Sequence, residues 1–221
     1  MKTTGRTCSS RLCSDDLLLQ MIYALTGFMG CGKSSIGREA ARLAGPSGES
    51  PCTAGQLQFI DLDDEIERRE GRSIPEIFAA VGEPGFREIE RKALLDVLSA
   101  EANSSDKKNT RQTLLSLGGG TLTDEGSREL IRKHCRCIYL RASIDTLVEN
   151  LSADGIEGRP MLAGTANGKD AAARTQALRK RISELMADRA PIYESAAGHI
   201  IDIDGLSYED AARMVLNSFS L

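Results

Sequence analysis

Residues 21–37 read MIYALTGFMGCGKSSIG, and this stretch determines the fold that the sequence predicts. The apolar run 21–26 is typical of a buried parallel strand. The next eight residues, 27–34, match G-x-x-x-x-G-K-[ST] without a mismatch, and a helical pattern continues over 34–44. A strand, a glycine loop and a helix in this order are the setting that a phosphate-binding loop requires. We therefore expect a nucleoside triphosphate site at this turn.

Each residue type in the loop has a physical role. The glycines let the backbone turn its N–H groups toward phosphate oxygens, and the helix after the loop adds the positive end of its dipole. The ammonium of Lys33 can reach the β- and γ-phosphates, and the hydroxyl of Ser34 is placed to ligate Mg²⁺. The residues expected to contact ATP are Gly30, Cys31, Gly32, Lys33, Ser34 and Ser35.

The rest of the chain alternates short apolar runs with helix-length amphipathic segments. Further strands are expected at 57–61, 113–117, 137–140 and 200–203. Helices are expected at 63–70, 74–81, 86–102, 125–133, 143–151, 171–187 and 208–219. Strands that alternate with helices predict a parallel sheet covered on both faces. The sequence therefore indicates an α/β protein with a central five-stranded parallel sheet flanked by helices.

Composition excludes several classes of protein. The 221 residues fit one domain, and 28 basic against 32 acidic residues give a formal net charge of −4. Nucleic-acid and anionic-membrane surfaces favour a basic excess, so neither partner is expected. The longest apolar run is far shorter than the roughly 20 residues of a membrane span. The six cysteines show no C-x-x-C spacing, and we expect free thiols, a reducing cytosol and a cytoplasmic protein.

Residues 1–20, MKTTGRTCSSRLCSDDLLLQ, differ in composition from the rest of the chain. A cleaved signal here would need an apolar core that ends before the mature chain. In this sequence the apolar stretch continues into the glycine loop, so cleavage would remove the first strand. We expect a disordered extension over 1–20, or translation from Met21, and one catalytic domain over 21–221. A targeting peptide is the alternative.

Carboxylates and arginines outside the phosphate loop are candidates for binding the group that accepts the phosphate. Asp61 and Asp63 end the second predicted strand, at the sheet edge where ligands of open α/β sheets bind. Arg87 and Glu90 are three residues apart and share a helix face. A guanidinium bonds both oxygens of a carboxylate or phosphate through its planar fork. Two more arginines stand in suggestive contexts: Arg159 in a glycine-rich stretch, and Arg189 at an expected break in a long helix.

The third predicted strand leads into a glycine triplet. Ser116-Leu-Gly118-Gly119-Gly120 lets the backbone approach a small ligand closely. A phosphate donor and a small carboxylate-bearing or hydroxyl-bearing acceptor are therefore expected to meet at the carboxyl ends of the strands.

At this point the sequence resembles the shikimate kinase family. The resemblance is carried by GFMGCGKSSIG (27–37), FIDLDDEIERREGRSIPEIF (59–78), GEPGFREIER (82–91), SLGGG (116–120), GRPML (158–162) and DRAPIY (188–193). These motifs occur in family order and extend over residues 22 to about 203. The resemblance implies a three-layer P-loop kinase fold with a mobile lid at about 153–171. It also implies ATP-dependent phosphorylation of the 3-hydroxyl of shikimate by direct in-line transfer, on the chorismate pathway.

The resemblance also implies roles for single residues. Asp63 would bind the acceptor hydroxyl and help to remove its proton, and Lys33 and Arg159 would complete the catalytic set. Ser34 and Asp61 would hold one Mg²⁺ per subunit, and Arg159, on the lid, would contact ATP. The residues implied in shikimate binding are Asp63, Arg87, Glu90, Gly118, Gly119, Gly120 and Arg189. The implied partners are ATP and shikimate, and the implied state is a monomer.

Departures from the family pattern concern the base of ATP. A basic residue that stacks on adenine often precedes the lid arginine by about seven positions, and here Ser152 stands there. No base-specific residue is therefore assigned. Two other functions stay open: another small-molecule P-loop kinase, such as a gluconate kinase, and a GTPase-like switch. The switch would need N-K-x-D, and Asn167-Gly-Lys-Asp170 carries an inserted glycine.

Overall fold

The computed structural model describes residues 21–45, 57–102, 112–155, 159–162, 164–165 and 170–220. The expected extension at 1–20 lies outside these residues. The strands are β1 (Ile22–Thr26), β2 (Leu57–Asp61), β3 (Gln112–Ser116), β4 (Cys135–Arg141) and β5 (His199–Asp202). These strands pair in parallel, in the order β2-β3-β1-β4-β5. The expected five-stranded parallel sheet is confirmed.

The helices lie where the amphipathic pattern predicts them, with one marked difference. They are α1 (Lys33–Leu43), α2 (Leu62–Glu70), α3 (Ile74–Ala102), α4 (Glu125–His134), α5 (Ile144–Asp154), α6 (Ala171–Ala196) and α7 (Tyr208–Asn217). The two helices expected at 74–81 and 86–102 are confirmed as the two parts of α3, because Gly82 between them has the non-helical angles φ 68° and ψ −179°. The difference is that α6 continues nine residues beyond its expected end at residue 187.

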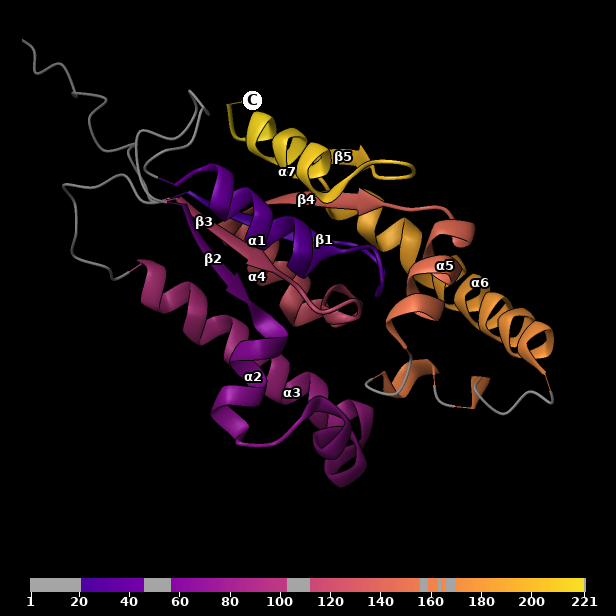
Figure 1. Ribbon diagram of the computed structural model, residues 1–221. Helices are drawn as coiled ribbons and strands as arrows, with labels where there is room; N and C mark the ends of the chain where they lie inside the picture. The colour runs from indigo at the N-terminus through magenta and orange to yellow at the C-terminus, as the bar shows by residue number, and fades with distance from the viewer. Residues whose placement is uncertain are drawn as a thin grey trace, which may run out of the picture.

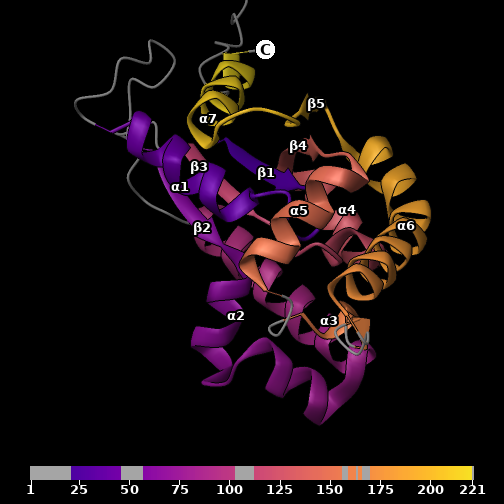
Figure 2. The same cartoon turned by 45° about the vertical axis from the view of Figure 1, so that its right-hand side comes forward.

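The central sheet is covered by helices on both faces (Figures 1 and 2). Helix α1 packs against α7 and over β1, β2 and β3, while α4 and α6 contact β4. Strand β1 is buried along its whole length, because both of its faces are covered. Its apolar residues join buried leucines and isoleucines of β3 and β4 in one core. The phosphate loop, which comes directly after β1, is therefore held by the most buried strand of the molecule.

Two helical pairs extend beyond the carboxyl ends of the strands. Figure 1 shows α2 with the first part of α3 on one side, and α5 with the first half of α6 on the other. Contacts join α2 to α3 and α5 to α6. Because the sheet is parallel, the loops after β1 and β3 and the start of α2 come to the same edge, between these two pairs. A short 3-10 helix, η2 (Pro160–Leu162), lies on the α5–α6 side.

The expectation of free thiols agrees with the three cysteines that the structure describes. Cys31, Cys135 and Cys137 form no disulfide. Burial raises the pKa of both Cys135 and Cys137 to about 12, so these thiols stay protonated at neutral pH. No helix in the described ranges combines the length and the apolar character that crossing a membrane requires.

Candidate active site

The loop between β1 and α1 has the backbone of a phosphate cradle. Gly27, Gly30 and Gly32 have φ values of 150°, 82° and 83°, a region that side chains with a Cβ rarely adopt. Gly32 is the N-cap of α1, and no side chain caps the helix there. The first N–H groups of α1 are therefore free to bind an anion.

Lys33 lies inside this loop and is 8% exposed. Its Nζ donates to the backbone oxygens of Gly27, at 2.9 Å, and Phe28, at 3.1 Å. The ammonium is thus held over the concave side of the loop by two weak carbonyl partners. An anionic phosphate is a stronger acceptor, so the side chain is available to one.

A cavity of about 190 Å³ lies beside the loop and collects the acceptor residues that the sequence predicts. Its wall includes one carboxylate from α2, an arginine and a glutamate from α3, the glycine triplet after β3, and arginines from the η2 segment and α6. The predicted residues in this wall are Asp63, Arg87, Glu90, Gly118, Gly119, Gly120, Arg159 and Arg189. Residues more than 120 positions apart in sequence therefore meet in one site.

The Arg87–Glu90 pair is confirmed and extends to a third residue. Arg87 Nη1 donates to Glu90 Oε2 at 2.6 Å, and the Glu90 side chain is 1% exposed. The other oxygen of Glu90 accepts from Thr121 Oγ1 at 2.6 Å. A second carboxylate, Glu83, accepts from Arg87 Nη2 at 3.2 Å. Arg87 Nε is buried and has no partner, so one donor of a rigidly held guanidinium remains for a ligand.

Two positions of the glycine triplet have no room for a side chain, because charged groups of the cavity occupy that space. A Cβ on Gly118 would lie 2.8 Å from Glu90 Oε1 and 3.0 Å from Asp63 Oδ1. A Cβ on Gly120 would overlap Arg87 Nη2. Real Cβ atoms do not approach so closely, so alanine at either position would displace a charged group of the cavity.

Arg189 reaches the cavity from within α6 rather than from a break in it. The expectation of a break at residue 189 is wrong, because α6 continues through Pro191 to Ala196. Proline in a helix loses one hydrogen bond, and buried side chains on either side of it compensate. Arg189 Nη1 donates to the Gly119 oxygen at 3.3 Å, and the Tyr193 hydroxyl donates to the same oxygen.

The same guanidinium connects the two halves of the site. The Arg189 Cζ lies 5.8 Å from the ring centroid of Phe28 in the phosphate loop. The residue is 4% exposed, and its described polar contacts, the Gly119 oxygen and the Tyr193 hydroxyl, are neutral groups rather than carboxylates. A positive charge buried beside a neutral acceptor favours the arrival of an anion.

The two aspartates of β2 and α2 differ in their surroundings. Asp61 is the N-cap of α2, and its Oδ1 accepts from the Asp63 backbone N–H at 3.0 Å. Burial, together with the carboxylates of Asp61 and Glu90, raises the pKa of Asp63 to about 7, against the opposing effect of Lys33 and Arg87. A carboxylate that titrates near neutral pH and faces a cavity is suited to accept a proton.

Arg159 lines the same cavity, and its described partners are weak. Asp154 lies 3.7 Å from it, and its Nη1 is buried without a hydrogen bond to any residue that the structure describes. Two glycines near it, Gly155 and Gly164, have φ values of 85° and 88°. The predicted lid arginine is therefore brought to the acceptor cavity with a donor to spare, although residues 156–158, 163 and 166–169 of this stretch lie outside the described ranges.

The residues predicted to hold Mg²⁺ come from the carboxyl edge, at or after two strands, β1 and β2, that β3 separates in the sheet. Ser34 is the second residue of α1, and Asp61 is the last residue of β2. One oxygen of Asp61 is used in capping α2, which leaves the other for a ligand. A hydroxyl and a carboxylate are hard oxygen donors that suit Mg²⁺, which usually takes its remaining ligands from phosphates and water. The donor set fits such an ion.

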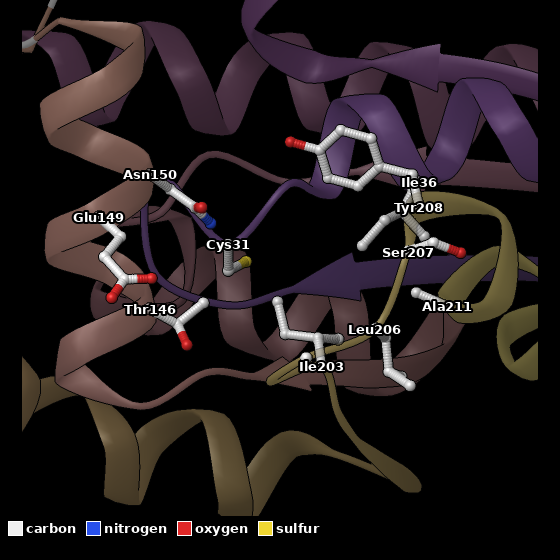
Figure 3. A pocket seen from close by; sticks show the side chains of 11 residues that line it. Cys31, Ile36, Thr146, Glu149, Asn150, Ile203, Leu206, Ser207, Tyr208 and Ala211 are labelled. Atoms are coloured by element: carbon white, nitrogen blue, oxygen red, sulfur yellow. The ribbon is translucent and has the colours of Figure 1, made fainter.

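A second cavity, of about 390 Å³, lies on the other side of the phosphate loop (Figure 3). Thr146, Glu149 and Asn150 enter it from α5, and Tyr208 enters it from the start of α7. Ser152, which stands where the family often has a basic residue, is not among the lining residues. The residue that α5 brings to the loop is Asn150, whose Nδ2 donates to the Gly30 oxygen at 2.8 Å.

Sequence reasoning missed Asn150 and Tyr208, which line the second cavity, and Thr121 and Tyr193, which contact residues of the first cavity. Tyr208 is half exposed, and a Cβ on Gly32 would lie 3.0 Å from its Cε1. The signal for Tyr193 was present in DRAPIY, but nothing local indicates that its hydroxyl reaches Gly119. Asn150, Tyr208 and Thr121 contact residues that are distant in the sequence, namely Gly30, Gly32 and Glu90, and they belong to no local motif.

The comparisons with known proteins agree with this geometry. The sequence profile described as shikimate kinase matches residues 29–219. A shikimate kinase of Salinibacter ruber is 38% identical over 195 residues, which are 86% of this chain and 81% of that protein. A shikimate kinase of Thermus thermophilus is 36% identical and covers 87% of this chain and 86% of its own.

Solved structures show the same likeness. A shikimate kinase from Acinetobacter baumannii in complex with shikimate has a TM-score of 0.72 at 26% identity, covering 94% of this chain and 97% of that one. A shikimate kinase from Bacteroides thetaiotaomicron has a TM-score of 0.71 at 28% identity, covering 91% of this chain and 99% of that one. Both the sequence profile and the fold extend over the two cavities.

Proposed function

This chain belongs to the shikimate kinase family and phosphorylates shikimate with ATP, and we propose that the cavity beside its phosphate loop holds the shikimate. Arg87 and Arg189 bind the shikimate carboxylate, and Glu90 orients Arg87. The support is a buried, unpartnered Nε on Arg87 and a guanidinium of Arg189 that lies deep in the cavity wall. A carboxylate would supply the acceptor that the Arg87 Nε lacks, and it would give Arg189 the anionic partner that its described contacts do not include.

Asp63 is the proposed proton acceptor for the 3-hydroxyl of shikimate. The hydroxyl oxygen attacks the γ-phosphorus in line as the bond to the β-phosphate oxygen breaks. The hydroxyl proton passes to Asp63, and ADP leaves. The role is supported by the position of Asp63 in the cavity and by a pKa of about 7, which matches the group to neutral conditions.

The loop residues 30–35 hold the phosphates in this proposal. The loop N–H groups and Lys33 bind the β- and γ-phosphates, and Ser34 with Asp61 would hold Mg²⁺ between them. When bound, that ion neutralises charge on the phosphate oxygens. Arg159 completes the set by placing its free donor on the γ-phosphoryl group.

The second cavity is the proposed position of the nucleotide base. It adjoins the phosphate loop at Cys31 and Ile36, and the half-exposed ring of Tyr208 offers an aromatic face (Figure 3). Base–aromatic stacking tolerates any base, while Glu149 and Thr146 supply acceptors for an exocyclic amine.

One observation carries the proposal: three arginines and a carboxylate with a raised pKa line one small cavity next to a phosphate loop. The test is a screen of phosphate transfer from ATP to shikimate, gluconate and nucleoside monophosphates. We expect transfer to shikimate alone. Preferred transfer to gluconate would favour the alternative small-molecule kinase. GTP hydrolysis without any acceptor would favour a switch, although Asp170, the one described residue of 167–170, caps α6 through the Ala173 N–H.

Replacing Arg189 by Lys is expected to raise KM for shikimate at least tenfold, while KM for ATP changes little. Lysine keeps the positive charge but loses the planar fork that matches a carboxylate. A loss of about 1.5 kcal/mol, the low end for hydrogen bonds to charged groups, corresponds to this factor. Steady-state kinetics with each substrate varied in turn make the measurement. Equal increases in both KM values would mean that Arg189 acts on the fold of the site and not on the carboxylate.

We further propose that residues 21–221 form the catalytic domain, that the enzyme acts as a monomer, and that it works in the cytoplasm. The monomer is the state that the resemblance to the family implies. The cytoplasmic assignment is supported by the free thiols of the described cysteines.

A further inference from the structure

The short helix η2, which comes directly after Arg159, is attached to the middle of α6. Arg181 Nε donates to the Met161 backbone oxygen at 3.1 Å. Leu162 is fully buried, and its oxygen accepts from Thr165 Oγ1 at 2.9 Å. A buried side chain and a hydrogen bond from a charged group thus fix a three-residue segment against a 26-residue helix.

The fixed segment carries two parts of the acceptor cavity. Arg159 and Met161 both line that cavity. The Leu162 N–H donates to the Arg159 oxygen at 2.9 Å, so the turn that Arg181 holds includes the backbone of Arg159. Among the described residues, the Arg159 guanidinium has a distant partner in Asp154, and its Nη1 is buried without a hydrogen bond. Its direction is therefore set by its backbone position more than by its own side-chain contacts.

We propose that Arg181 is a positioning residue for phosphoryl transfer: it holds the turn 159–162 so that the Arg159 guanidinium points into the acceptor cavity. The proposal rests on the role proposed above for Arg159. Arg181 does not line the cavity, so it acts through Arg159 and Met161 rather than on the substrates. Its side chain is 39% exposed, and Glu184 lies 3.7 Å from its Nη1, which keeps the guanidinium over the turn.

The first test compares Arg181→Gln with Arg179→Gln. Arg179 is on the same helix and forms a surface ion pair with Asp145, away from the turn, so its replacement removes an arginine contact without touching η2. We expect Arg181→Gln to lower kcat about tenfold, because a hydrogen bond from a charged group is lost. KM for ATP and the melting temperature should stay close to those of Arg179→Gln. Arg181→Lys, which keeps a charged donor, should recover part of kcat.

The second test is a double-mutant cycle with Arg159→Ala, measured at enzyme concentrations high enough to follow the residual rate. If Arg181 acts through Arg159, Arg181→Gln should have little further effect on kcat once Arg159 is absent. A full tenfold loss in the Arg159→Ala background, or an unchanged kcat in Arg181→Gln alone, would overturn the inference. An unchanged kcat in Arg159→Ala alone would instead contradict the proposed role of Arg159, so the two failures are distinguishable.

Discussion

Replacing Arg159 by Ala is expected to lower kcat by about 10³–10⁵-fold, the range found for arginines that stabilise charge in phosphoryl transfer. KM for shikimate should change little, because the carboxylate is proposed to bind Arg87 and Arg189 instead. The physical reason is that negative charge on the transferring group increases in the transition state, where a desolvated guanidinium is most effective. Steady-state kinetics, with shikimate binding measured separately by calorimetry, give both quantities.

The matched control for this variant is Asp154→Asn. Asp154 forms an ion pair with Arg159, but the 3.7 Å separation and the exposure of Asp154 make this a weak pair. Removing it should leave kcat near the native value. A native-like kcat in Arg159→Ala would show that Arg159 is a solvated loop charge and would remove it from the catalytic set.

Replacing Asp63 by Asn is expected to lower kcat by about 10²–10⁴-fold, the usual contribution of a positioned general base. Asparagine has nearly the same shape but cannot accept the hydroxyl proton. An Asp63→Asn enzyme with native turnover would rule out the base role and leave only hydroxyl binding.

The pH dependence gives an independent test of the same residue. Only ionised Asp63 can accept a proton, and its pKa in the ligand-free enzyme is about 7. We therefore expect kcat/KM for shikimate to fall by about tenfold per unit as the pH is lowered below 7, and to level off above it. The terminal phosphate of ATP also titrates in this region, since phosphate monoesters have a second pKa of about 6. The effect of that phosphate on the pH profile persists in Asp63→Asn, while the effect of Asp63 disappears.

Stability measurements separate lost catalysis from lost fold. The folded-state pKa of Asp63 lies above its ordinary value of 3.8. The ionised carboxylate therefore destabilises the folded protein at pH values above 7, and this penalty vanishes as the pH falls below the ordinary value. Asparagine removes the penalty. Asp63→Asn should accordingly melt no lower than the native enzyme at pH 8, even though its turnover is reduced.

Local sequence was sufficient for most of the fold. The alternation of apolar runs and amphipathic segments predicted all five strands to within two residues at each end, and the phosphate loop was predicted from the spacing of its glycines and Lys33. The Arg87–Glu90 pair was also accessible, because residues three apart on a helix are neighbours. In each case the deciding contacts lie within a few residues of one another.

The continuation of α6 shows why local signals can fail. Pro191 indicates a helix end, but the helix continues because Arg189 and Tyr193, on either side of it, both donate to the Gly119 oxygen. Those two contacts span 70 and 74 positions. Their contribution offsets the hydrogen bond that proline removes, and it exists only in the assembled molecule.

By itself, the sequence determined the fold class, the phosphate loop and the identities of the charged groups in the site. These features depend on residue chemistry and on spacing between residues that are close together in the chain. Only the tertiary structure decided how those groups are held. Asn150 reaches the Gly30 oxygen across 120 positions, Thr121 completes the partners of Glu90, and Arg181 holds the turn after Arg159. Such contacts arise when a parallel sheet brings the carboxyl ends of separate strands to one edge, and a spacing rule for neighbouring residues carries no information about which distant atoms will meet there.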